Sequence, residues 1–71
     1  MKKKIAILGS TGSIGRSTIE IVKKNNNNFD VVLLSANENY KSLIRQAKEI
    51  KVKNVLINNK KFFKKVKKAL R

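Results

Sequence analysis

The chain contains no cysteine and no histidine, and only four of its 71 residues are acidic. Without cysteine it can form neither a disulfide nor a thiolate metal site, and without histidine it lacks the commonest general base and zinc ligand. The acidic residues lie far apart in the sequence, so we expect no carboxylate cluster that could hold a divalent cation; they are Glu20, Asp30, Glu38 and Glu49. The composition therefore argues against a complete active site within these residues.

Long apolar runs are also missing. The charged start Met1–Lys4 is followed by four apolar residues that stop at Gly9, whereas the core of a signal peptide needs roughly 7–15 apolar residues. A transmembrane helix would need about 20 of them. We therefore expect no membrane partner and a cytoplasmic location.

Positive charge, by contrast, is abundant: the net charge is +14 and comes almost wholly from lysine. Such a chain can bind nucleic acid or another anionic surface. However, lysine, asparagine and isoleucine are all common while proline and tryptophan are missing, which is the composition that an AT-rich coding sequence produces. We therefore expect ordinary solvated lysines and no nucleic-acid partner. A basic nucleic-acid-binding module that uses the segment Lys60–Arg71 is the alternative from another class.

The hydrophobic pattern predicts alternating strands and helices. Ile5–Leu8 is a short apolar run typical of a strand buried on both faces, and Phe29–Ser35 is a second strand. Between them, helical spacing places four side chains on one predicted face, namely Ile14, Thr18, Ile21 and Val22. A second amphipathic helix is expected over Tyr40–Ile50, and a third strand over Val52–Ile57. A lysine-rich third helix follows, with an apolar face of Phe62, Phe63, Val66 and Leu70.

The order β-α-β-α-β-α with short connections predicts an α/β fold with a parallel sheet. Right-handed crossovers would give the spatial strand order 3-2-1, which is one Rossmann-like half-domain. No residues are left to build the second half of such a sheet.

All three glycines lie within seven residues, where the first strand meets the first helix. A helix N-terminus offers bare N–H groups and about half a positive charge to a pyrophosphate. Gly9 would permit the tight turn, Gly12 would let the backbone approach the phosphates, and Gly15 would let the helix pack closely on the sheet. The hydroxyl groups of Ser10, Thr11 and Ser13 can add hydrogen bonds to the phosphates. Ser13 or Thr11 can also cap the helix.

The spacing G-x-x-G-x-x-G differs from the familiar G-x-G-x-x-G, but the required context of strand, turn and helix is present. A turn that merely connects strand to helix is the alternative, although it needs one glycine rather than three. The second strand ends without an acid at its tip, and Ser35, Asn37 and Asn39 can donate hydrogen bonds, which favours NADP over NAD. Glu38 would favour NAD if its side chain faced the ribose, or it can point to solvent.

Beyond this generic pattern, the run Ile5–Gly15 (I-A-I-L-G-S-T-G-S-I-G), followed by Phe29 before two valines and by Ala36-x-x-Asn39, resembles the 1-deoxy-D-xylulose 5-phosphate reductoisomerase family. The resemblance implies an NADPH-dependent, metal-dependent oxidoreductase that converts 1-deoxy-D-xylulose 5-phosphate to 2-C-methyl-D-erythritol 4-phosphate for isoprenoid synthesis. Another NADP-dependent oxidoreductase with the same opening is the alternative, because aspartate-semialdehyde dehydrogenases share a related glycine spacing.

Carried over by position, the family's contacts to the pyrophosphate of the cofactor fall on Thr11, Gly12, Ser13 and Ile14. Contacts to the adenosine ribose and its phosphate fall on Asn37, Glu38 and Asn39. Where this chain has Asn37 and Glu38, the family often has a glycine and a basic residue, and the missing positive charge lowers the expected strength of 2′-phosphate binding.

The resemblance further implies that residues 1–71 are the N-terminal part of a dinucleotide (NADPH)-binding domain, with the catalytic and C-terminal domains absent and no turnover by these residues alone. No catalytic residue is expected in this chain. The divalent metal (Mg or Mn), the sugar-phosphate substrate and the homodimer contacts of the family would involve residues outside it.

Overall fold

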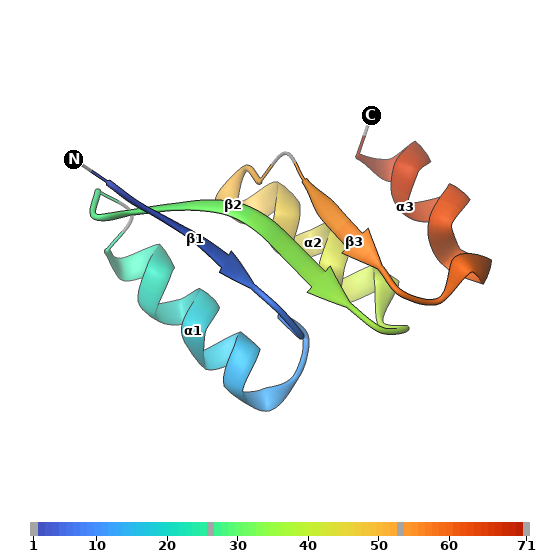
Figure 1. The fold of residues 1–71 in the computed structure, drawn as a ribbon, viewed down its shortest axis with the longest axis horizontal. Helices are drawn as coiled ribbons and strands as arrows, with labels where there is room; N and C mark the ends of the chain where they lie inside the picture. Colours follow the sequence, from blue (N-terminus) through green and yellow to red (C-terminus); the bar gives the residue numbers. More distant parts are fainter. Residues whose placement is uncertain (1, 26, 53, 71) are drawn as a thin grey trace.

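The computed structural model describes residues 2–25, 27–52 and 54–70. Strands and helices alternate along these residues, and the three strands form one parallel sheet in the order β1-β2-β3 (Figure 1). The elements are β1 (Lys3–Ile7), α1 (Ser13–Lys24), β2 (Phe29–Ala36), α2 (Tyr40–Ile50), β3 (Val55–Ile57), the 3₁₀ helix η1 (Lys60–Phe62) and α3 (Phe63–Ala69). The predicted α/β class and strand order are confirmed.

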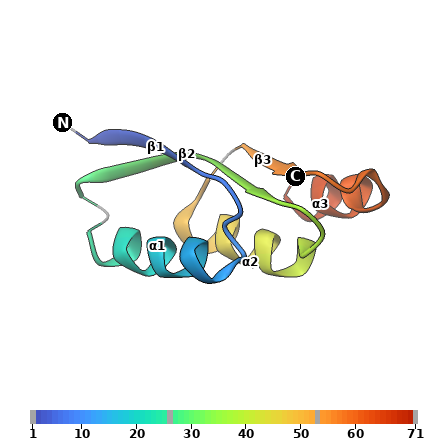
Figure 2. The same ribbon diagram turned by 60° about the horizontal axis from the view of Figure 1, so that its bottom comes forward.

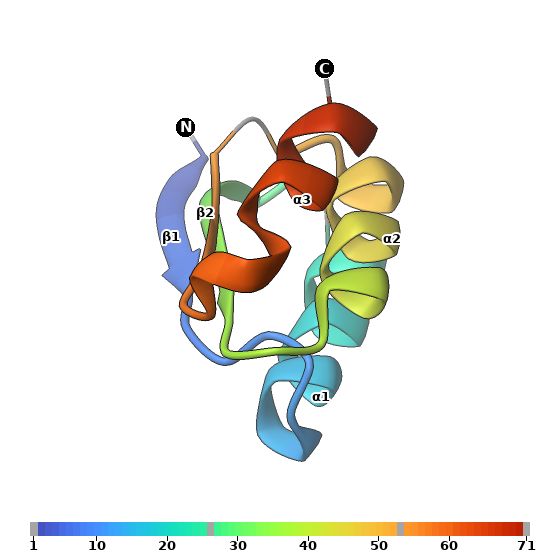
Figure 3. The same cartoon turned by 90° about the vertical axis from the view of Figure 1, so that its right-hand side faces the viewer.

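Both crossover helices lie on the same face of the sheet. Figure 2 shows α1 and α2 below the strands, while Figures 1 and 3 place α3 beside β3 and α2. A right-handed β-α-β connection puts its helix on a fixed side, so two successive crossovers in one direction cover one face. Among the described residues, the opposite face of the sheet has no covering helix layer.

The register brings the carboxyl ends of the strands to one edge of the sheet. Ile7, the last residue of β1, lies opposite Leu34 near the end of β2, and Ala36, the last residue of β2, lies opposite Ile57, the last residue of β3. The loops that follow β1, β2 and β3 therefore leave the sheet at the same edge, where open α/β sheets bind their ligands.

Strand β1 is shifted from its expected position. It begins at Lys3 and ends at Ile7, and the side chain of Leu8 is 72% exposed. The expectation that this strand is buried on both faces is wrong, because within the described residues β1 forms an edge of the sheet and no helix covers its second face.

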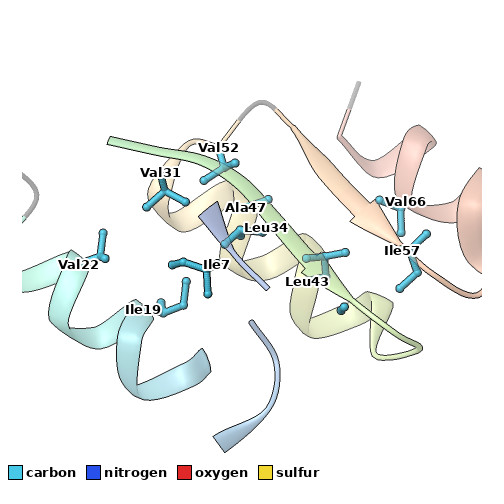
Figure 4. Close-up of a cluster of buried hydrophobic side chains, with 11 residues drawn as sticks. Ile7, Ile19, Val22, Val31, Leu34, Leu43, Ala47, Val52, Ile57 and Val66 are labelled. Carbon is cyan, nitrogen blue, oxygen red and sulfur yellow. The ribbon is translucent and has the colours of Figure 1, made fainter. Parts of the chain in front are cut away.

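The core lies between the sheet and its two crossover helices. Leu34 of β2 and Leu43 of α2 are fully buried at its centre. Figure 4 shows the buried aliphatic side chains converging from both layers; they are Ile7, Ile19, Val22, Val31, Leu34, Leu43, Ala47, Val52, Ile57 and Val66. The described residues include no helix with the length and apolar character needed to cross a membrane.

The buried stripe of helix α1 matches the predicted one only at Val22. Gly15, Ile19 and Val22 face the core, whereas Ile14 is 85% exposed and Ile21 is 56% exposed. The predicted stripe and the buried stripe lie side by side on the helix, have the same helical spacing and both contain isoleucine. Periodicity alone therefore could not decide which of them faces the core. The close contact made by Gly15, described below, selects the second.

Helix α3 packs mainly through Val66, which is buried. Just before it, at the end of η1, the ring of Phe62 stacks on Tyr40 with centroids 4.6 Å apart. Phe63 was predicted on the apolar face but is 55% exposed. The ammonium group of Lys65 lies 5.2 Å above the ring of Tyr40. Every described lysine of α3 is exposed, so the helix presents its charge to solvent.

An ion pair joins the two crossover helices at the surface. The Nζ atom of Lys23 donates to Oε2 of Glu49 at 2.8 Å. This hydrogen bond raises the pKa of Lys23 and lowers the pKa of Glu49 from their usual values. Both groups are solvent-exposed, so the pair contributes little to stability.

Candidate functional site

The turn between β1 and α1 is shaped by two of its glycines. Gly9 has a φ of +65°, in the left-handed region that glycine adopts without steric cost. The N–H of Gly12 donates to the carbonyl oxygen of Gly9 at 3.0 Å, and the carbonyl oxygen of Gly12 accepts from Arg16 at 2.8 Å. Gly12 is therefore the N-cap residue of α1, with no side-chain cap. The expectation that Thr11 or Ser13 caps the helix is wrong.

Gly15 lies directly against the backbone of this turn. A Cβ atom at Gly15 would lie 2.2 Å from the carbonyl oxygen of Gly9 and 2.6 Å from the Cα atom of Ser10. The predicted close approach at Gly15 is confirmed, although the neighbour is the turn itself. At Gly12 the only neighbour of an added Cβ would be the Gly9 oxygen at 3.5 Å, an ordinary contact.

Ser10 is turned into the protein. Its side chain is fully buried, and its hydroxyl donates to Oε1 of Gln46 at 2.8 Å. The Nε2 atom of Gln46 donates in turn to the carbonyl oxygen of Ser10 at 2.9 Å. The Ser10 hydroxyl is therefore not placed to bind a phosphate, contrary to expectation. The only sequence signal for Gln46 was a polar residue within the apolar stripe of the helix.

Ser35, at the end of β2, holds the turn from the other side. Its carbonyl oxygen accepts from the N–H of Ser10 at 2.8 Å, and its hydroxyl accepts from the N–H of Gly9 at 3.2 Å. The side chain is buried. Its expected role as a donor to the cofactor is not supported by this geometry, because the hydroxyl faces the turn.

Backbone donors remain at the start of α1. Among the described residues, the N–H groups of Thr11, Ser13 and Ile14 have no hydrogen-bond partner. Ser13 and Ile14 belong to the first turn of α1, where this is usual, and Thr11 precedes the N-cap residue. No acidic residue lies in that turn, so the positive end of the helix dipole is not neutralised there. Gly12, Ser13 and Ile14 are exposed, and a groove beside them is bounded by β1 and Thr18.

The second group of predicted site residues follows β2. The Oδ1 atom of Asn39 accepts from the N–H of Ser42 at 3.3 Å and so caps α2. The Oδ1 atom of Asn37 accepts from Nδ2 of Asn58 at 2.5 Å. The carbonyl oxygen of Asn37 also accepts from the N–H of Asn59 at 3.0 Å. The loop after β3 thus supports this group, a contact that sequence analysis did not identify.

The structure places the two predicted groups, residues 11–14 and 37–39, at the same edge of the sheet. The contacts of Ser35 with Gly9 and Ser10 join their supporting backbones directly. Glu38 is exposed at this edge. Nowhere in the described ranges do three potential metal-ligating acidic residues gather, so these residues do not fit the metal that the family resemblance implies.

A parallel sheet with both crossover helices on one face, and a glycine turn where its first strand meets a helix, defines a Rossmann-like α/β unit. Within this class, the family profile of 1-deoxy-D-xylulose 5-phosphate reductoisomerase matches residues 5–71. The chain belongs to the 1-deoxy-D-xylulose 5-phosphate reductoisomerase family.

Similar proteins carry the same family name. The reductoisomerase of Porphyromonas gingivalis is 58% identical over 59 residues, which are 83% of this chain and 15% of that protein. The reductoisomerase of Pelagibacter ubique is 54% identical over 57 residues, which are 80% of this chain and 15% of that protein. The solved Zymomonas mobilis reductoisomerase in complex with NADPH has a TM-score of 0.95 and 34% identity, and covers 99% of this chain and 18% of its own. The chain thus spans less than a fifth of these relatives.

Proposed function

We propose that residues 1–71 form the N-terminal part of the NADPH-binding domain of a 1-deoxy-D-xylulose 5-phosphate reductoisomerase. The observation that carries this proposal is the set of unpartnered N–H groups of Thr11, Ser13 and Ile14, which surround exposed Gly12 at the start of α1. Backbone donors at a helix N-terminus bind pyrophosphate. The solved relative from Zymomonas mobilis, which has the same fold over these residues, is a complex with NADPH.

The adenosine ribose and its 2′-phosphate are assigned to Asn37, Glu38 and Asn39. The amide oxygens of both asparagines already accept hydrogen bonds within the protein. Their Nδ2 groups are left as donors, which suits a phosphate because its oxygens are acceptors. Glu38 opposes this role through its negative charge.

For the whole protein we propose the family's reaction, the isomerisation and reduction of 1-deoxy-D-xylulose 5-phosphate to 2-C-methyl-D-erythritol 4-phosphate, in the cytoplasm and as a homodimer. The sugar-phosphate substrate and the Mg or Mn ion would be held by residues outside this chain. Its own residues supply cofactor binding and no catalytic group.

A chimera tests the cofactor assignment. In it, residues 1–71 replace the matching segment of the Zymomonas mobilis reductoisomerase, whose fold over these residues is nearly the same. We expect fluorescence titration to give an affinity for NADPH at least about tenfold higher than for NADH, a difference of about 1.4 kcal/mol. A preference for NADH would refute the assignment of residues 37–39.

Reversing the charge at Glu38 should strengthen this preference. In the chimera, Glu38→Lys is expected to raise NADPH affinity about tenfold and leave NADH affinity nearly unchanged, because a carboxylate near the 2′-phosphate is replaced by an ammonium group. Asp30→Lys is the matched control, since it makes the same charge change at an exposed position near the opposite end of β2. An equal gain from both variants would show that only net charge matters, and would remove Glu38 from the site.

A further inference from the structure

The hydrogen bonds between Ser10 and Gln46 are the feature of the turn that nucleotide binding alone does not explain. Both side chains are buried, at 0% and 5% exposure, and Ser35 is the other buried polar residue of an otherwise aliphatic core among the described residues. Burying polar groups is costly unless they are hydrogen-bonded, and an apolar side chain could fill the same space. Two hydrogen bonds join this one pair, so the glutamine does more than fill the core.

The second of these bonds controls a peptide plane. The Nε2 atom of Gln46 donates to the carbonyl oxygen of Ser10 from the core side, at 2.9 Å. In a planar trans peptide, the carbonyl of one residue and the N–H of the next point in opposite directions. Holding the Ser10 oxygen toward the core therefore directs the N–H of Thr11 away from the core, toward the exposed surface of the turn.

The neighbouring contacts restrict this peptide further. Ser35 fixes the N–H groups of Gly9 and Ser10, and Gly15 lies against Ser10 from the helix side. An accepted hydrogen bond also polarises the peptide, which makes the N–H of Thr11 a stronger donor.

We propose that Gln46 is a positioning residue for the cofactor: from α2 it holds the Ser10–Thr11 peptide so that the N–H of Thr11 faces the pyrophosphate of NADPH. The proposal rests on the proposed function of the turn. It assigns a role in binding to a helix residue that lies 36 positions from Ser10 and does not touch the ligand. The donor is aligned before the ligand arrives, which reduces the ordering cost of binding.

The test compares Gln46→Met with Leu43→Ala in the chimera. Methionine matches the size of glutamine but cannot donate to Ser10. Leu43 is fully buried on the same helix and its side chain has no hydrogen-bonding group, so its truncation destabilises α2 without removing a hydrogen bond to the turn. We expect Gln46→Met to raise the Kd and KM for NADPH about tenfold while kcat at saturating NADPH stays the same. Leu43→Ala should lower the thermal midpoint at least as much, yet change the Kd less than about twofold.

An equal rise in Kd for both variants would overturn the proposal, because general destabilisation would then explain it. So would an unchanged Kd in Gln46→Met. If that variant does not fold, Gln46→Leu replaces it, since leucine is a compact apolar side chain that also cannot donate to the Ser10 carbonyl. Gly12→Val, which blocks the turn itself, distinguishes a failure of the positioning role of Gln46 from a failure of the proposed NADPH-binding function. If Gly12→Val weakens NADPH binding and the Gln46 variants do not, the positioning role is wrong and the proposed function stands. If the unmodified chimera does not bind NADPH, both are wrong.

Discussion

Replacing Gly15 with alanine is expected to abolish cooperative folding of the 71-residue chain. The added Cβ would lie 2.2 Å from the Gly9 oxygen and 2.6 Å from the Ser10 Cα atom, so it meets backbone that cannot rotate away. Helix α1 would have to move off the turn, and overpacking of this kind costs about 3 kcal/mol or more. A domain of this size has only about 3–5 kcal/mol of stability to lose.

Circular dichroism during thermal unfolding measures this effect, with Gly12→Ala as the matched control. Alanine at Gly12 meets only the Gly9 oxygen, at an ordinary 3.5 Å, and the backbone there is extended. The control should unfold cooperatively with a midpoint within a few degrees of the unmodified chain, a change of about 1 kcal/mol or less. Cooperative unfolding of Gly15→Ala at the original midpoint would show that the helix does not depend on this contact.

Gly12→Val is expected to lower NADPH affinity by at least about 100-fold while leaving the fold intact. Gly12 is exposed at the N-cap of α1, between the free N–H groups of Thr11 and Ser13. Branched methyl groups there would keep the pyrophosphate from reaching those donors. Each hydrogen bond to a charged group contributes about 1.5–3 kcal/mol, so the loss of two accounts for the effect.

The measurement is fluorescence titration of the chimera with NADPH, accompanied by thermal unfolding. Ser17→Val serves as control, because it places the same side chain on an exposed position of α1 about one turn further along the helix. We expect its NADPH affinity to stay within about twofold of the unmodified chimera. If Gly12→Val retains that affinity too, the cofactor does not approach the turn at Gly12.

The sequence predicted the architecture well, because it depends on local patterns. The bounds of α2 at Tyr40 and Ile50, and the start of β2 at Phe29, follow from clear changes in periodicity and are confirmed. The end of β1 was misplaced because Leu8 is as apolar as Ile7. What separates them is that no described element covers the second face of the sheet, a property of the assembled fold that local sequence does not carry.

The candidate site could be predicted only in part. Glycine spacing identified the turn, and the φ of Gly9 and the contact of Gly15 agree with their expected roles. The directions of polar side chains could not be predicted, because each depends on a partner far along the chain. Ser10 and Ser35 look like candidate ligand donors in sequence, yet they hydrogen-bond to Gln46 and to Gly9. The hydrogen bond from Asn58 to Asn37 could not be predicted either, because the two residues lie 21 positions apart in the sequence.

The outer edge of β1 gives the positive charge of the lysines a physical role, which is to keep copies of the chain apart. At the outer edge of β1, exposed Leu8 and Ile14 lie beside strand hydrogen-bonding groups that have no neighbouring strand among the described residues. An uncovered edge of this kind promotes pairing between copies of a protein. The net charge of +14 opposes such contact through mutual repulsion. Self-association of the chain should therefore increase with salt concentration, because salt screens the repulsion between lysines while the edge of β1 can still pair with another copy.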